Sequence, residues 1–125
     1  MLTWTVDLER IEPWLTALDN DSREQVIAAL RILSDLGPQL GRLLVDSVTS
    51  SRHKNMKELR PGSFGRSELR ILFAFDPHRR AILLLAGDKA GSWTQRYRRS
   101  IPIADDLFDE HLRCLKRGTG HGPDA

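Results

Sequence analysis

The chain has 125 residues, of which 40% are hydrophobic and 29% charged, as is usual for a single globular domain. Its one cysteine, Cys114, excludes a disulfide scaffold, and its longest apolar run, Ala81–Ala86, is far shorter than the ~20 residues of a membrane span. The formal net charge is only +2, but residues 52–99 hold twelve basic and four acidic side chains. This segment predicts a polyanionic partner, either a nucleic acid or an acidic protein, although a solvated basic face would explain the same charges. The N-terminal residues show no secretory signal, so we expect a cytoplasmic protein.

Residues 2–38 predict a short strand and two helices. Residues 2–6 alternate apolar and polar side chains, which favours a strand. Apolar residues at helical spacing follow, and Pro13 either lies in the first turn of a helix that starts near Glu12 or breaks that helix. The turn at 19–22 offers several N-caps, among them Ser22, whose spacing to Gln25 is that of a capping box. The next helix should end at Gly37-Pro38, with an apolar stripe made of Val26, Ile27, Leu30, Leu33 and Leu36.

A second half rich in strands is predicted to follow a long loop. Residues 39–54 lack sustained periodicity, apart from an irregular strand near 43–45. Strands are then expected at 55–60, 68–75 and 80–86, the last of them buried on both faces. Because short turns join these three strands, they should form an antiparallel meander, with the N-terminal strand at an edge.

The C-terminal part predicts one closing helix. Residues 93–99 read as irregular and basic, and an apolar stripe that includes Phe108 and a packed His111 follows Pro102. We therefore predict one domain over residues 1–117 and a flexible tail over 118–125. The fold class is α+β, with a mainly antiparallel sheet of about four strands, N-terminal helices and a C-terminal helix, and with the helices packed on one face.

A cluster of cations on the predicted strands is the best candidate for chemistry. The alternation in the third strand places Arg70 on its exposed face, opposite Leu69 and Ile71. Strand ends in a meander can come close, so the basic residues and one tyrosine could share a concave face opposite the helices. These candidates are Lys54, Lys57, Arg60, Arg66, Arg70, Lys89, Arg96, Tyr97, Arg98 and Arg99.

These residue types suit the cleavage of RNA without a metal ion. The reaction needs a base for the 2′-hydroxyl, positive charge for the phosphorane and a proton for the leaving 5′-oxygen. Lysine, arginine and tyrosine can supply all three, although the same residues could simply bind phosphate. The four histidines show no ligand-like pairing, and the glycines lack the spacing of a nucleotide-binding loop. We therefore expect no metal and no cofactor.

Four stretches carry a resemblance to a known family: 54–60 (KNMKELR), 69–77 (LRILFAFDP), 84–89 (LLAGDK) and 101–107 (IPIADDL). In this order and spacing they resemble the phage-derived HigB branch of the RelE/ParE toxin superfamily, over nearly the whole chain up to Lys116. The resemblance implies the RelE-like microbial RNase fold. It also implies a toxin that cleaves mRNA, usually on the ribosome, and is neutralised by a helix-turn-helix antitoxin. Operator DNA would be bound only through that antitoxin.

The same resemblance assigns roles to single residues. Arg70 matches the arginine that stabilises the scissile phosphate, Lys89 the basic residue after the fourth strand, and Tyr97 a tyrosine near the C-terminus. The register places Glu58 where the family has one of two strand lysines, which leaves Lys57 as the nearby catalytic candidate. RNA-binding roles are expected for Lys54, Arg60, Arg66, Arg96, Arg98 and Arg99. The alternative is a ParE-like toxin that binds a protein such as gyrase, or an RNA-binding relative without catalysis.

Overall fold

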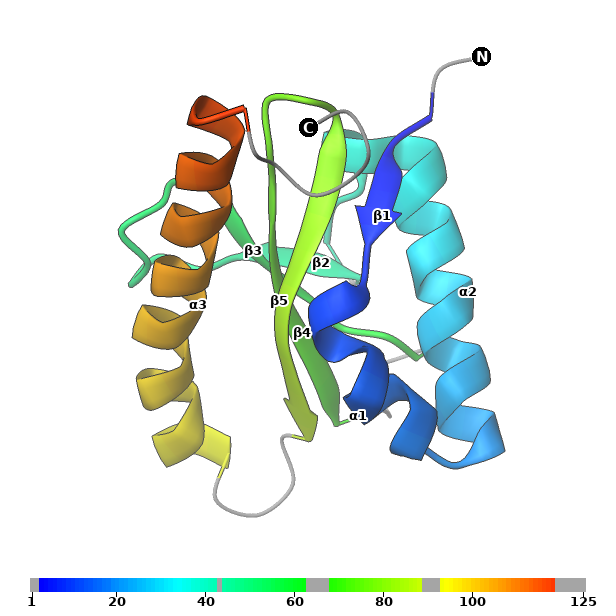
Figure 1. The fold of residues 1–125 in the computed structure, drawn as a ribbon. Helices are drawn as coiled ribbons and strands as arrows, with labels where there is room; N and C mark the ends of the chain where they lie inside the picture. Colours follow the sequence, from blue (N-terminus) through cyan, green and yellow to red (C-terminus); the bar gives the residue numbers. More distant parts are fainter. Residues whose placement is uncertain (1–2, 43, 63–67, 89–92, 119–125) are drawn as a thin grey trace.

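The computed structural model of the chain describes residues 3–42, 44–62, 68–88 and 93–118, with the side chains of 93–98 left out. It is an α+β fold in which three α-helices flank one sheet (Figure 1). Within the described ranges, no helix is both long enough and apolar enough to cross a membrane. The elements are β1 (Thr5–Asp7), α1 (Glu12–Ala17), α2 (Asn20–Leu36), β2 (Val45–Ser47), β3 (Met56–Leu59), β4 (Leu69–Phe75), β5 (Arg80–Asp88) and α3 (Trp93–Lys116).

The five strands lie in the order β1-β5-β4-β3-β2. The predicted meander is confirmed, since β3, β4 and β5 pair antiparallel in sequence order. The N-terminal strand joins at an edge as expected, and it runs parallel to β5. The remaining strand, β2, pairs antiparallel with β3 and forms the opposite edge of the sheet. It forms at Val45–Ser47, which starts where the irregular strand expected near 43–45 ends.

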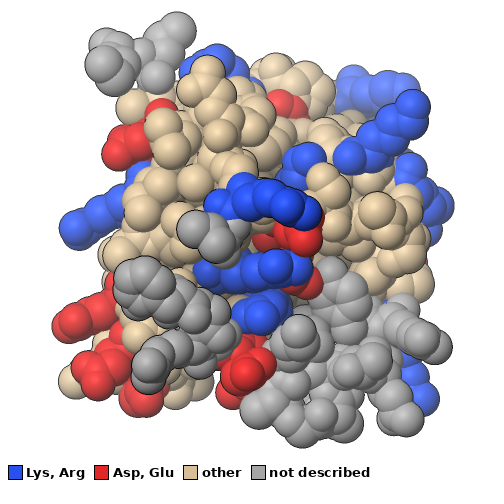
Figure 2. All heavy atoms as spheres, turned by 180° about the vertical axis from the view of Figure 1, so that it is seen from behind, with Lys and Arg blue, Asp and Glu red and all other residues tan. Residues whose placement is uncertain are grey.

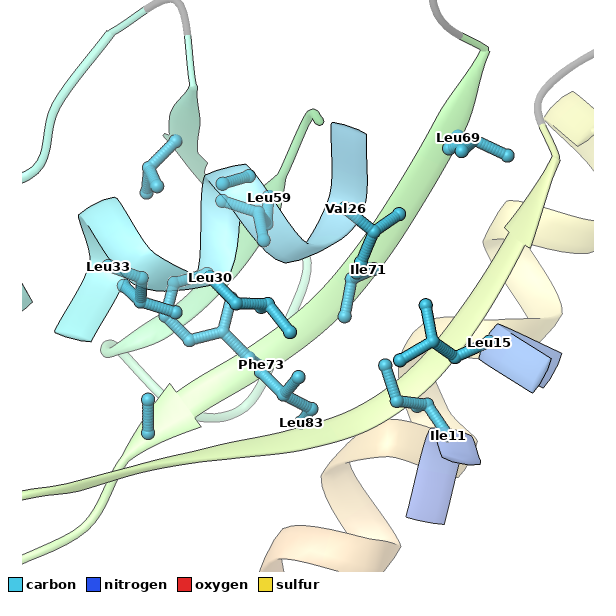
Figure 3. Close-up of a cluster of buried hydrophobic side chains, with 13 residues drawn as sticks. Ile11, Leu15, Val26, Leu30, Leu33, Leu59, Leu69, Ile71, Phe73 and Leu83 are labelled. Carbon is cyan, nitrogen blue, oxygen red and sulfur yellow. The ribbon is translucent and has the colours of Figure 1, made fainter. Parts of the chain in front are cut away.

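The expectation that the helices cover one face of the sheet is wrong, because they cover both (Figure 1). On one face, α1 and α2 pack against alternate residues of β4 and β5, including Ile71, Phe73 and Leu83 (Figure 3). On the other face, α3 contributes its own apolar stripe. That second core comprises Val48, Met56, Leu72, Ala74, Ile82, Leu84, Ile101, Ala104 and Phe108. Both faces of β4 and β5 are therefore buried, which explains the almost unbroken apolar sequences of these two strands.

Helix α2 begins and ends through local contacts. Its N-cap is Asp19 instead of Ser22, and the Asp19 carboxylate accepts the N–H of Ser22 at 2.8 Å. At the other end, Gly37 has φ +56°, and a Cβ at this position would lie 2.3 Å from Nε1 of Trp4. The predicted stop is thus confirmed, and its glycine also makes room for the Trp4 ring. Of the predicted stripe, Val26, Leu30 and Leu33 are buried, whereas Ile27 and Leu36 are exposed.

Helix α3 starts nine residues before the position predicted for it. The segment 93–99 is helical instead of irregular, and the helix continues through Pro102. Proline inside a helix removes one backbone hydrogen bond and crowds the preceding turn. Burial of Ile101 and Ala104 against the sheet offsets this cost, because both side chains are almost inaccessible to water.

Polar contacts tie the loop before β3 to α3. Asp105 of α3 accepts hydrogen bonds from Ser51 Oγ and from the backbone N–H of Arg52. Arg52 also pairs with Asp106 and Asp109. These contacts explain why residues 48–55 hold a defined position without the periodicity of a helix or strand.

Candidate functional site

A chain of four charged side chains crosses β2, β3 and β4. Glu58 Oε1 accepts from Arg60 Nε at 2.7 Å and lies 3.7 Å from Arg70 Nε. Arg60 Nη2 in turn donates to Asp46 Oδ2 at 3.1 Å. Two carboxylates and two guanidiniums thus alternate from the edge strand β2 to the central strand β4.

The strand register explains why these residues meet. Glu58 pairs with Leu72 across β3 and β4 and with Asp46 across β2 and β3. Since side chains two residues apart share a face, Arg70 lies on the same face as Leu72, which packs in the core beneath α3. The site therefore lies on the α3 side of the sheet, opposite α1 and α2.

Burial decreases along the chain of charges. The side chains of Glu58 and Arg70 are only 8% and 11% exposed, whereas those of Arg60 and Asp46 are 42% and 46% exposed. Arg70 Nη1 also donates to the carbonyl oxygen of Leu69 at 2.7 Å. Nearly buried ions at this spacing interact more strongly than surface pairs do, because little water screens them. A carboxylate beside a guanidinium can accept a proton while the cation holds an anion.

The prediction that Arg70 is exposed is wrong. Alternation placed it correctly on the side opposite Leu69 and Ile71, but that side is buried as well, and Arg70 is only 9% exposed. The reason is the two-layer cover of the sheet: a sheet with helices on one face leaves the other open to water, and this sheet has no such open face at β4. Arg70 is consequently a nearly buried, ion-paired arginine.

The structure does not bring the two predicted lysines of this region to Arg70. Lys57 points to the opposite face of β3 from Glu58, and its Nζ lies 3.3 Å from Ser47 Oγ. Lys54 is exposed in the loop that precedes β3, whereas Arg60 follows the end of that strand. The expected single face shared by all the cations is therefore wrong; Arg60 and Arg70 come together there, and Lys54 and Lys57 do not.

For most of the remaining predicted residues, the structure describes either the backbone alone or nothing. Lys89 and Arg66 are outside the described residues. Tyr97, Arg96 and Arg98 belong to the first turns of α3, not to an irregular loop, and their side chains are not described. Arg99 is exposed on the same helix. All of these remain predictions.

The predicted basic segment is less positive on its described surface than its sequence suggests. Four of its described arginines pair with carboxylates: Arg52, Arg60, Arg70 and Arg80. Figure 2 shows the outcome on the face behind the view of Figure 1, where basic side chains lie beside acidic ones in the middle of the surface. Neighbouring carboxylates cancel part of the field that the count of cations predicts.

A second polar cluster lies at the far end of β4. Asp76 accepts from His111 Nε2 at 2.8 Å and from Arg80 Nε at 3.1 Å, and the side chains of Asp76 and His111 are fully buried. Burial raises the pKa of Asp76, but hydrogen bonds from His111 and from backbone N–H groups outweigh it and hold that pKa below its ordinary value. Burial lowers the pKa of His111 despite the nearby carboxylate. Both shifts favour a neutral histidine that donates to an ionised aspartate. The prediction of a packed His111 is confirmed by its full burial.

A hollow of about 400 Å³ opens beside this pair, lined by His53, Asn55, Phe75, Asp76, Pro77, Phe108 and Leu112. It lies about one strand length from the four charged side chains, since Phe75 is the last residue of β4 and Arg70 lies near the start of that strand. The five residue steps from Arg70 to Phe75 span about 17 Å. The hollow and the Glu58–Arg70 pair are therefore separate places in the fold.

Sequence reasoning missed the roles open to Glu58 and Asp46. Glu58 stood out only as a departure from the lysine pattern of the resembled family, and Asp46 carried no signal in a segment read as loop. The signal that could have found them is the strand pairing itself, which places Asp46, Glu58 and Leu72 side by side.

The comparisons with known proteins identify the family. Residues 13–109 match the family described as phage derived protein Gp49-like. The chain is 62% identical over 109 residues to Putative toxin HigB2 of Mycobacterium tuberculosis, covering 87% of this chain and 54% of that protein. It is 52% identical over 105 residues to Putative toxin HigB3 of the same organism, covering 84% of this chain and 90% of the relative.

The chain belongs to the phage-derived Gp49-like family and is a HigB-type member of it. Its fold agrees with the RelE-like architecture that the resemblance implied: a mostly antiparallel sheet with N-terminal helices and a C-terminal helix. The chain spans about half the length of the HigB2 relative and nine-tenths of the HigB3 relative.

Proposed function

We propose that this chain is the toxin of a toxin–antitoxin pair and acts as a metal-independent endoribonuclease on mRNA. The similarity to proteins named as HigB toxins supports the first part. The observation that carries the second part is the nearly buried Glu58–Arg70 pair, which joins a proton acceptor to an anion-binding guanidinium. Cleavage would take place on the ribosome in the cytoplasm, and would stop translation.

In this account, Glu58 and Arg70 divide the chemistry between them. The Glu58 carboxylate removes the proton from the 2′-hydroxyl, which then attacks the adjacent phosphorus. Arg70 stabilises the extra negative charge of the pentavalent phosphorane. The 5′-oxygen of the next nucleotide leaves and takes up a proton, so a 2′,3′-cyclic phosphate and a 5′-hydroxyl result.

Two predicted residues stay as candidates for the leaving-group proton: Tyr97 and Lys89. Lys57 is a weaker candidate than Glu58 for the base, because the pleat of β3 turns it away from Arg70. Arg66, Arg96, Arg98, Arg99 and Lys54 are proposed to bind the RNA backbone. These cations would follow the mRNA without reading its bases.

The partners follow from the same proposal. A cognate antitoxin of the helix-turn-helix class would silence the toxin, and operator DNA would be bound by that antitoxin. The nearly buried position of Arg70 favours a substrate that is already held in place, as mRNA is on a ribosome. A nearly buried guanidinium reaches a phosphate only from a narrow range of directions, so orientation by the ribosome would contribute much of the rate.

Induced expression of the chain in a bacterial culture, followed by primer extension on total RNA, tests this function. We expect new discrete 5′ ends inside coding regions for the parent chain and for the control Arg113→Ala, an exposed arginine of α3. Glu58→Gln and Arg70→Lys should weaken these ends by about 100-fold, the usual cost of losing one transition-state contact. Growth arrest without new ends in the parent chain would contradict the nuclease and favour a protein target such as gyrase.

A further inference from the structure

Two carboxylates hold the guanidinium of Arg60, although a phosphate-binding arginine on the surface needs no such contacts. Its Nε donates to Glu58 Oε1 at 2.7 Å, and its Nη2 donates to Asp46 Oδ2 at 3.1 Å. The backbone N–H of Arg60 donates to the carbonyl oxygen of Leu44 at 2.7 Å, which fixes the backbone from which the side chain extends. One guanidinium therefore bridges two carboxylates that come from different strands.

Asp46 is fixed in turn by its own strand. Its Oδ1 accepts the backbone N–H of Ser47 at 2.8 Å, so only Oδ2 faces Arg60. The order of contacts is backbone of β2, Asp46, Arg60 and then Glu58. The planar, forked donor set of arginine suits such a bridge, whereas the single ammonium of lysine cannot bind both carboxylates in the same geometry.

The contact with Arg60 determines where the Glu58 carboxylate lies. The oxygen that Arg60 holds is the same Oε1 that lies 3.7 Å from Arg70 Nε. If Arg60 released it, Glu58 could swing onto Arg70 and form a closer pair, which would occupy the cation needed for the phosphate. Arg60 therefore keeps the base and the phosphate-binding cation apart while both stay in reach of one substrate.

We propose that Arg60 and Asp46 are positioning residues, which keep the Glu58 carboxylate from closing further on Arg70 and hold it in place for proton transfer. This role rests on the proposed function of the Glu58–Arg70 pair, and it replaces the RNA-binding role expected for Arg60. A misplacement of a catalytic group by about 1 Å can cost on the order of 100-fold in rate. The effect of losing Arg60 or Asp46 should therefore fall on the rate of the bound complex, and not on the affinity for RNA.

Single-turnover cleavage of mRNA on programmed ribosomes, with purified full-length chains, separates the two effects. Arg60→Lys keeps the positive charge but loses the bridge, so the maximal rate should fall by at least about tenfold while the half-saturating concentration stays within twofold. Asp46→Asn should lower the maximal rate in the same direction by a smaller factor. Ser47→Ala is the matched control, because Ser47 adjoins Asp46 on β2 but its hydroxyl contacts Lys57 on the other face. Circular dichroism confirms that each variant is folded.

A double-mutant cycle tests whether Asp46 acts through Arg60. We expect Asp46→Asn to have no further effect on the maximal rate in the Arg60→Lys background. An equal effect in both backgrounds would overturn the chain of contacts. The salt dependence of binding to a single-stranded oligonucleotide should be the same for Arg60→Gln and the parent; a slope smaller by ~0.7 would assign Arg60 to a phosphate contact and overturn the positioning role.

Failure of this inference can be told apart from failure of the proposed function. If the parent chain cleaves and Glu58→Gln does not, but Arg60→Lys and Asp46→Asn cleave at the parental rate, only the positioning role is wrong. If the parent chain itself cleaves no RNA on ribosomes, the proposed function is wrong and the positioning role falls with it.

Discussion

Glu58 and Arg70 stand on neighbouring strands with Glu58 Oε1 3.7 Å from Arg70 Nε, and neither side chain is more than about one-tenth exposed. Removal of either partner leaves the other ion nearly buried with fewer compensating contacts. The pair is thus both a candidate for catalysis and a contributor to the stability of the sheet, and variants must be chosen so that the two effects can be separated.

Arg70→Ala should destabilise the fold. Glu58 would keep Arg60 but lose its second cation, and a cavity would form beside β5, so the free energy of unfolding should fall by about 2–4 kcal/mol. Urea unfolding measures this directly. The control Arg113→Ala removes an arginine whose side chain is 58% exposed and should change the free energy of unfolding by less than about 0.5 kcal/mol. Equal stability of the two variants would mean that Arg70 is open to solvent.

Gly37→Ala should also be strongly destabilising. Gly37 has φ +56°, and an added Cβ would meet the Trp4 ring at 2.3 Å. Strain in the backbone and displacement of Trp4 should together cost more than about 1 kcal/mol in thermal or urea unfolding. Gly41→Ala is the matched control, since its nearest contact would be 4.0 Å away and its φ is not positive. A cost as small as that of the control would show that Trp4 does not pack on Gly37.

The Asp76–His111 pair predicts a loss of stability in acid. The pKa of His111 is lowered in the fold, so the unfolded chain binds a proton on this group near its ordinary pKa of 6.5 while the folded chain does not. Stability should therefore fall as the pH drops through that value, and it should fall again at lower pH as Asp76, whose pKa is also lowered, takes up a proton. Arg10 and Arg80 add to the first effect, because both disfavour a charged His111.

Urea unfolding between pH 7 and pH 5 measures this dependence. His111→Gln keeps a side chain that can donate to Asp76 but does not titrate, so its stability should vary less than that of the parent over this range. His78→Gln, in the exposed turn before β5, is the control and should retain the parental pH dependence. Identical pH profiles for the parent and His111→Gln would mean that folding does not lower the pKa of His111.

Arg52→Ala should loosen the loop before β3 without unfolding the domain. The hydrogen bond to Asp109 raises the pKa of Arg52, and the hydrogen bond from Arg52 lowers the pKa of Asp109, as expected for a close ion pair. Both groups are solvent-accessible, so global stability should change little. Hydrogen exchange should become faster at residues 48–55 and stay unchanged in β5. Unchanged exchange in the loop would show that Asp105 and Ser51 hold it by themselves.

The sequence was sufficient to predict β4, β5 and the meander, because alternation and turn residues act locally. It was not sufficient for the start of α3, since Pro102 and the basic run at 93–99 argue locally against a helix that burial of Ile101 and Ala104 stabilises. The burial of Arg70 is likewise a tertiary effect that alternation does not reveal. Alternation shows which face a side chain occupies, but only the tertiary packing decides whether that face meets water.

The candidate site was predictable in part for a similar reason. Arg70 and Arg60 were found as cations on strands, and the structure brings them together through Glu58. Glu58 itself looked like an interruption of a basic pattern, because a single sequence does not reveal which charges face each other. Lys57 was favoured because it is a cation next to Glu58 in the sequence, yet adjacent residues of a strand point to opposite faces.

The most direct test of the central claim uses an mRNA in which the scissile nucleotide lacks its 2′-hydroxyl. Once the cut site has been mapped on ribosomes, the same message is prepared with one 2′-deoxy nucleotide at that position, and its cleavage by the purified chain is measured beside that of the unmodified message. If Glu58 activates the 2′-hydroxyl, the modified message should stay intact, and the unmodified one should yield a 2′,3′-cyclic phosphate that Glu58→Gln produces about 100-fold more slowly. Cleavage of the modified message at the parental rate would contradict this account.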